Sequence, residues 1–159
     1  MGESGRILTP VSNIIEIERL KSLASSQKMN GDFAGALKAR QALEAIYDDE
    51  SVDPRHQVQN LQLIANMAVH LQSLAEAKRS ARKCVTLSTG ISEESKATCL
   101  MLLSCVLAES AEFEEATVFA ERAIEIFESI FGPDSDFVAH RKNDLNRMRL
   151  RNLGGYLDR

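Results

Sequence analysis

The stretch that decides the fold is TCLMLLSCVLAESAEFEEATVFAERAIEIFESIFG, residues 98–132. Its first half places apolar or small side chains at positions i, i+3, i+4 and i+7, which form one face of an α-helix. They are Leu100, Leu103, Ser104 and Leu107. A turn is expected near Ala111–Glu112, and the second half places small side chains at helical spacing, at Ala116, Ala120 and Ala123. Small side chains let two helices approach closely, so the stretch predicts a packed helical hairpin.

The rest of the chain repeats this hairpin. The small residues that open the second helix of each unit are Ala36, Ala77 and Ala116, which recur with a period of about 40 residues. The expected boundaries carry matching signals, because Asp and Ser cap helix starts, Pro suits the first helical position and Gly ends a helix. These signals are a turn at Asn30–Asp32, starts at Asp53–Pro54 and Ser92, and a stop at Gly132–Pro133.

Residues 98–132 resemble the tetratricopeptide repeat (TPR), whose first helix carries large, large, small and large residues and whose second helix is rich in alanine. Standard units repeat at about 34 residues. The longer spacing resembles the repeats of the kinesin light chain family, as does AIEIFESIFGPDSDFVA, residues 123–139, in which Gly-Pro-Asp ends a helix. The resemblance covers roughly residues 17–140. It is strongest in the third unit and weaker in the first, where Arg40 and Leu43 replace small or aromatic residues.

The predicted fold is all-α: a right-handed superhelical stack of about three TPR-like hairpins followed by a C-terminal capping helix, about seven helices in all. We expect one α-solenoid domain over residues 11–153, with a polar connector near residues 48–52. The units are expected at about 14–50, 54–90 and 92–132, the capping helix at about 136–153, and flexible segments at 1–10 and 154–159. The basic residues of the last helix are interpreted as a solvated cap, with a patch for an acidic partner as the alternative.

Composition excludes several classes of function. The net charge of −4 argues against nucleic-acid binding, and no apolar run approaches the ~18 residues that a membrane span needs. Cys84, Cys99 and Cys105 do not form a disulfide framework, which favours a reducing, cytoplasmic location. The three histidines lie far apart and no catalytic or phosphate-binding motif occurs, so no enzyme activity, metal or cofactor is expected.

A partner is expected in the concave groove, which the first helix of each hairpin lines between its packing positions. The residues predicted to bind a partner are Lys21, Ser25, Gln62, Leu63, Asn66, His70, Met101, Leu102 and Cys105. Val69 and Ala108 face the same way in this alignment. Met101 and Leu102 either serve the groove or pack beneath the last helix. The alternative for His70 is an ordinary, partly exposed histidine. The alternative for Cys105 is a small apolar residue of the groove or core.

The resemblance also allows one specific ligand to be tested against the sequence. TPR domains that bind chaperones hold a C-terminal carboxylate with a clamp of five lysine, asparagine and arginine residues. Lys21 matches the first clamp position, whereas the other four are occupied by Ser25, Leu63, Thr98 and Leu102. These residues cannot form the charged hydrogen bonds of the clamp. No binding to the C-terminal tails of heat-shock chaperones is therefore expected.

The predicted function is that of a non-catalytic adaptor or scaffold, a protein–protein interaction module that binds a peptide or a partner protein in the concave groove. Two alternatives remain. The chain could be the helical C-terminal region of a larger enzyme, such as a SET/MYND-type lysine methyltransferase, which has similar hairpins. It could also be a structural protein that associates with itself through the apolar end of the groove. The expected state is a monomer or a weak homodimer.

Overall fold

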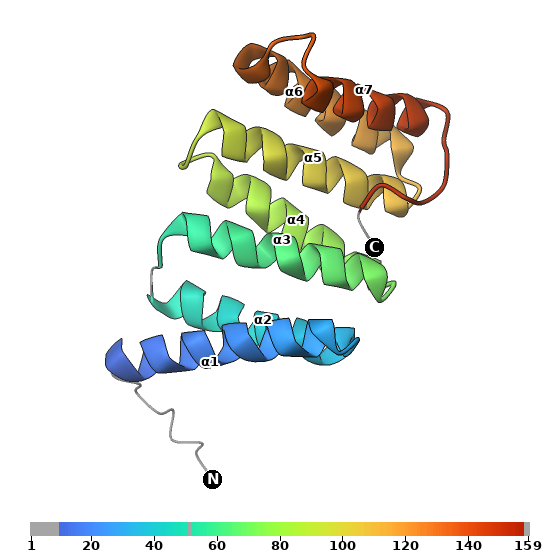
Figure 1. Cartoon of the computed structure of the whole chain (residues 1–159). Coiled ribbons are helices and arrows are strands. Elements are labelled where there is room, and N and C mark those ends of the chain that lie inside the picture. Colours follow the sequence, from blue (N-terminus) through green and yellow to red (C-terminus); the bar gives the residue numbers. More distant parts are fainter. Residues whose placement is uncertain (1–9, 51, 158–159) are drawn as a thin grey trace. The chain divides into compact units, whose positions relative to one another are not determined.

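The computed structural model describes residues 10–50 and 52–157. Over these residues the chain folds into seven α-helices and no strand (Figure 1). The helices belong to two compact units, unit 1 ending at Ser51 and unit 2 beginning at Val52. Each unit is built from antiparallel helical hairpins, so the predicted all-α fold is confirmed. A single solenoid domain over residues 11–153 stays a prediction.

Unit 1 is one hairpin, formed by α1 (Pro10–Met29) and α2 (Phe33–Glu50). Its core is aliphatic and includes Leu20, Ala24, Ala36 and Leu43. The polar connector was expected near residues 48–52, but α2 continues to Glu50, so the connector is shorter than predicted. The amide of Asn13 donates a hydrogen bond to the Glu50 carboxylate, which ties the end of α2 to the start of α1.

Unit 2 contains the remaining five helices. They are α3 (Pro54–His70), α4 (Leu74–Ser88), α5 (Glu93–Glu109), α6 (Phe113–Phe131) and α7 (Asp136–Arg149). The pairs α3/α4 and α5/α6 are hairpins, α4 packs against α5, and α7 packs against α6 (Figure 1). Helix starts are capped as the sequence predicts: the side chains of Asp53 and Ser92 accept hydrogen bonds from the backbone N–H groups of Arg55 and Ser95 at 2.9 and 3.1 Å.

The same left-handed turn ends the first helix of every hairpin. Gly31, Gln72 and Ala111 have φ values of 79°, 58° and 58°. In each turn the next residue donates its N–H to the carbonyl five residues earlier, which satisfies a carbonyl that the helix end would otherwise leave unpaired. The donor–acceptor pairs are Asp32 and Gln27 at 2.8 Å, Ser73 and Ala68 at 2.7 Å, and Glu112 and Leu107 at 2.9 Å.

The turn recurs a fourth time, after α7. Arg151 has φ 55°, and Asn152 donates its N–H to the Arg147 carbonyl at 3.0 Å. Arg151 follows Ala111 by one repeat period, so the helix α7 occupies the place of the first helix in a fourth repeat. The capping helix was predicted to end near residue 153. This turn explains why α7 ends earlier, at Arg149.

No second helix follows α7 in the described part of the chain. Tyr156 stands five residues after Arg151, at the position where Ala36, Ala77 and Ala116 open their helices. Gly154 and Gly155 precede it with φ values of 72° and 77°, which a right-handed helix does not contain. Residues 154–157 were expected in a flexible tail, but the structure buries the Tyr156 side chain to 6% exposure.

The helix α5 is the centre of unit 2. All ten of its side chains from Cys99 to Ala108 are buried, because α4 and α6 flank it and the chain after α7 returns across it. The Ser104 hydroxyl donates to the Ala116 carbonyl of α6 at 2.7 Å, so this small polar side chain joins the hairpin and leaves no unpaired group. The predicted large and small positions of α5 are therefore confirmed as core.

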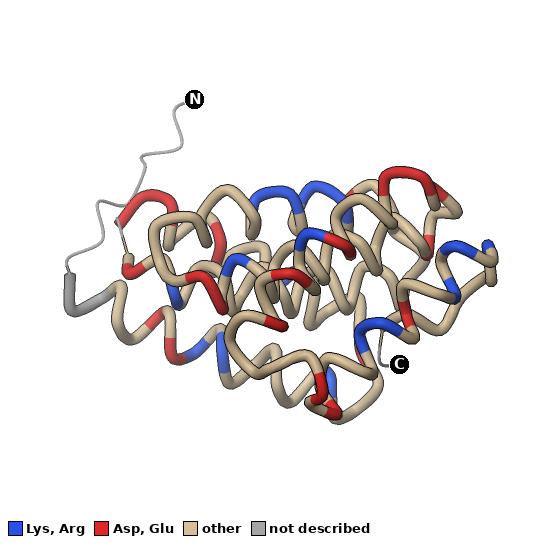
Figure 2. The backbone as a smooth tube through the Cα atoms, turned by 90° about the horizontal axis from the view of Figure 1, so that it is seen from above, with Lys and Arg blue, Asp and Glu red and all other residues tan. Residues whose placement is uncertain are grey.

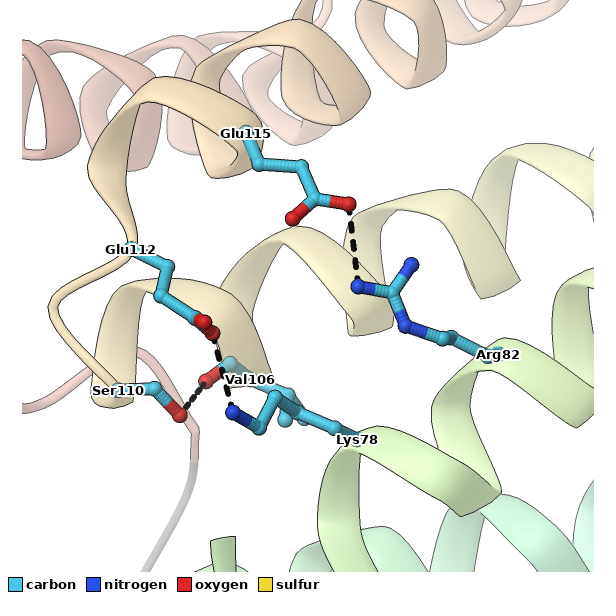
Figure 3. Close-up of polar contacts among 6 residues, drawn as sticks. All are labelled: Lys78, Arg82, Val106, Ser110, Glu112 and Glu115. Carbon is cyan, nitrogen blue, oxygen red and sulfur yellow. Dashed lines mark hydrogen bonds and ion pairs between the residues drawn. The ribbon is translucent and has the colours of Figure 1, made fainter. Parts of the chain in front are cut away.

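Ion pairs join neighbouring hairpins of unit 2 at their outer edge. Lys78 pairs with Glu112 at 3.3 Å and Arg82 pairs with Glu115 at 3.0 Å, which connects α4 to the start of α6 (Figure 3). Further pairs connect α6 to α7: Lys142 with Glu128 at 2.7 Å and Arg149 with Glu121 at 3.0 Å. The paired side chains are partly or largely exposed to solvent, so each pair contributes little to the stability of the fold.

The end of α6 offers a test of the fold. Gly132 has φ 85° and ψ 151°, a conformation that is essentially restricted to glycine. We expect Gly132→Ala to lower the free energy of unfolding by about 1–3 kcal/mol, measured by urea denaturation. Gly90 has a negative φ and no atom within 4 Å of an added Cβ, so Gly90→Ala is the matched control and should be neutral or slightly stabilising. Equal losses in both variants would contradict the prediction.

Candidate functional site

A hollow of about 480 Å³ opens in unit 2. Four helices and the segment after α7 contribute to its wall. The lining residues are Gln62 and Asn66 of α3; Glu94, Thr98, Met101, Leu102 and Cys105 of α5; Phe127 and Phe131 of α6; Phe137 and Arg141 of α7; and Tyr156 and Leu157. Its volume is in the range of pockets that hold ligands or side chains of a partner.

The floor of the hollow is apolar. Met101 and Leu102 are neighbours on α5, and Cys105 lies about one turn further along. They keep 4%, 9% and 1% of their surface exposed. Met101 and Leu102 pack in the core and present their remaining surface to the hollow, and their part in binding a partner stays a prediction. Phe131 and Phe137 add an aromatic side, with ring centroids 5.3 Å apart and nearly half of each side chain exposed.

Polar groups lie on the other side of the floor. Gln62 and Asn66 are four residues apart on α3, so their amides project from the same face of the helix. A second hollow of about 380 Å³ adjoins the first, because Gln62, Glu94 and Thr98 line both. We call the two hollows together the unit 2 groove. The unit 2 groove can therefore hold an extended peptide. The amides can form hydrogen bonds with the peptide backbone, and the apolar floor can contact one of its side chains.

The segment after α7 forms one wall of the groove and is held at several points. The Arg147 guanidinium donates to the carbonyls of Gly154 and Gly155 at 2.7 and 3.2 Å and lies 4.6 Å from the centre of the Tyr156 ring. The Tyr156 N–H donates to the Glu109 carboxylate at 2.9 Å. Burial raises the pKa of the Tyr156 hydroxyl. This wall was not predicted, although the period of the alanine positions leads to residue 156.

The structure brings together five of the nine residues predicted to bind a partner, namely Gln62, Asn66, Met101, Leu102 and Cys105. Leu63 and His70, also on α3, do not line the groove, and His70 is exposed. Lys21 and Ser25 lie on α1 and line a separate hollow of unit 1. The role of all nine in binding stays a prediction.

Two further alignment positions are corrected. Val69 and Ala108 were expected to face the groove, but both are buried, with 2% and 0% of their surface exposed. Each lies one turn or less before the left-handed turn that ends its helix, where the next helix folds back over it.

The described residues offer little for other chemistry. Among them, no group of three or more His, Cys, Asp or Glu side chains could hold a metal ion. Within residues 10–50 and 52–157, no helix combines the length and apolar character of a membrane span. Acidic and basic positions are interspersed along the backbone of both units (Figure 2).

The family described as "Tetratricopeptide repeat" has a sequence model that matches residues 96–136, which include most of α5 and all of α6. The predicted family is therefore confirmed, and this part of the chain is a tetratricopeptide repeat. Such repeats are generally non-catalytic and bind other proteins. The finer likeness to kinesin light chain stays a prediction. No curated protein matches the sequence significantly.

The buried thiol of Cys105 gives a prediction about pH. Burial raises its pKa from 9.0 to about 12. The unfolded chain then loses this proton near pH 9 while the folded protein keeps it. The contribution of this thiol to the free energy of unfolding is therefore fully present below pH 9. It decreases as the pH rises towards 12. We expect Cys105→Ala to lose less free energy of unfolding than the unmodified chain between pH 8 and pH 11, as measured by urea denaturation. An identical loss in both would contradict the assignment.

Proposed function

We propose that this chain is a non-catalytic interaction module that binds an extended peptide segment of a partner protein in the unit 2 groove. The observation that carries the proposal is the apolar floor of α5 beside two amide side chains of α3. The floor suits a side-chain anchor, and the amides suit the backbone of an extended chain. The tetratricopeptide-repeat match at residues 96–136 supports the same class of function.

The environment of the cysteines supports an intracellular setting. Cys84, Cys99 and Cys105 are buried, and none of them forms a disulfide within the described part of the chain. Cysteines that are not linked by disulfides fit a reducing compartment such as the cytosol. The buried thiols also pack as small apolar groups in the core, in keeping with a binding function.

The test uses a random library of twelve-residue peptides displayed on phage and selected on the full chain. Selected peptides are synthesised, and their dissociation constants are measured by fluorescence anisotropy. The variant Gln62→Ala/Asn66→Ala removes both groove amides and should weaken binding by about tenfold or more, because two polar contacts to the peptide backbone are lost. Both side chains are partly exposed, so the fold should survive the change.

The matched control is Asn143→Ala/Asn146→Ala, which removes two amides from exposed positions of α7 outside the groove. It should bind the selected peptides as the unmodified chain does. Equal binding by the groove variant would place the peptide elsewhere on the chain. A selection without any binder would contradict peptide binding altogether, and a doubled molar mass in sedimentation would then favour self-association.

A further inference from the structure

We propose that the unit 2 groove selects a partner segment in which an apolar side chain is flanked by an acidic residue on one side and a basic residue on the other. The acidic side chain pairs with Arg141, and the basic one pairs with Glu94. The inference rests on the proposed function and specifies its ligand. It is carried by the two opposite charges that line the same apolar hollow.

Arg141 is placed by the repeat to face the groove. It follows Met101 by one repeat period, and Met101 follows Gln62 by one period, so the three occupy equivalent positions on α7, α5 and α3. All three line the hollow. The helix α7 therefore contributes a cation at the position where α5 contributes an apolar side chain and α3 contributes an amide.

The guanidinium of Arg141 has unused capacity to bind an anion. Its Nε is buried and has no hydrogen-bond partner among the described residues. Within residues 10–50 and 52–157, the carboxylate that pairs with it is that of Asp144, with an oxygen 3.8 Å from the terminal nitrogen. A charge-assisted hydrogen bond is about 2.7–2.9 Å long, so this contact leaves the donors largely unsatisfied. The guanidinium also lies 5.6 Å from the centre of the Phe137 ring, which helps to fix its plane.

A carboxylate is the chemical group that fits these donors. A planar guanidinium binds a carboxylate with two parallel hydrogen bonds, and the apolar surroundings strengthen that pair relative to water. Phe131 and Phe137 lie at the same part of the wall with exposed ring surface. A ligand carboxylate on Arg141 therefore places the neighbouring side chain of the ligand against aromatic and aliphatic surface.

Glu94 supplies the opposite charge. It lies in the first turn of α5, its side chain is exposed, and it lines both hollows of the groove. From Glu94 to Leu102 the helix advances about 12 Å, which an extended peptide covers in about four residues. The negative charge of Glu94 also disfavours a phosphate backbone or an anionic membrane surface, so a peptide of mixed charge is the better occupant.

The test uses synthetic nine-residue peptides that are acetylated and amidated, so that neither end is charged. Each has a central Phe or Leu in a Gly-Ser background. In the first peptide, Asp stands two residues before the centre and Lys four residues after it. In the second the two are exchanged, and in the third they are replaced by Asn and Gln. The two charged peptides have the same composition and net charge. We expect one charge order to bind about tenfold tighter than both the other order and the neutral peptide.

Variants of the chain assign the charges. Arg141→Gln should abolish the preference for one order, and Arg141→Lys should keep part of it, because the charge remains but the two parallel hydrogen bonds are lost. Glu94→Gln should reduce the preference independently. Arg122→Gln and Glu125→Gln, at exposed positions of α6 outside the groove, are the matched controls and should leave the preference unchanged. Circular dichroism and thermal melting verify that each variant is folded.

The outcomes separate this inference from the proposed function. Equal binding of the three peptides, or a preference that persists in folded Arg141→Gln, would overturn the inference. Phage-selected peptides whose binding needs Gln62 and Asn66, but which carry no charge beside their apolar residue, would also overturn the inference. In that case the proposed function stands. If neither the synthetic peptides nor the phage library yields a binder, both proposals fail together.

Discussion

The structure of unit 2 depends on the close approach of its helices, which their small side chains permit. Ala77 and Ala81 on α4, and Ala116, Ala120 and Ala123 on α6, are fully buried where these helices face their neighbours. A larger side chain at any of these positions would push two helices apart, because a close-packed interior has no spare volume. The outer ion pairs can form only because the helices come this close. The groove follows from the same packing, because the spacing of α3, α5 and α7 determines its width.

Much of this architecture was predictable from local sequence signals. Caps at Asp53 and Ser92, and the turn at Asn30–Asp32, act through a few neighbouring residues, so they can be recognised without tertiary information. The place of α7 as a fourth first helix was not predictable in the same way. Its turn is formed by Arg151, an arginine in a left-handed conformation, and residue 156, one repeat period after Ala116, is a tyrosine. The backbone preferences of the residues concerned predict neither feature.

The candidate site was predicted in part for a related reason. Periodicity identifies the face of a helix, so Gln62, Asn66 and Met101 were found by counting along α3 and α5. Periodicity does not show which surfaces a later segment covers. Arg141, Phe131 and Tyr156 join the site from α7, from the end of α6 and from the segment beyond α7. The repeat period leads to Arg141 and to residue 156, but it does not show that their side chains line the same hollow as Phe131.

The burial of α5 on all sides has a consequence for how relatives of this domain can diverge. Residues 99–108 contribute to the core as well as to the floor of the groove, so most substitutions that changed the floor would also disturb the packing. The surfaces open to change are the polar positions of α3 and the outer residues of α7. Duplicated copies of such a domain would therefore acquire new binding preferences through their flanking helices. The sequence of their central helix, the counterpart of α5, would meanwhile stay nearly constant.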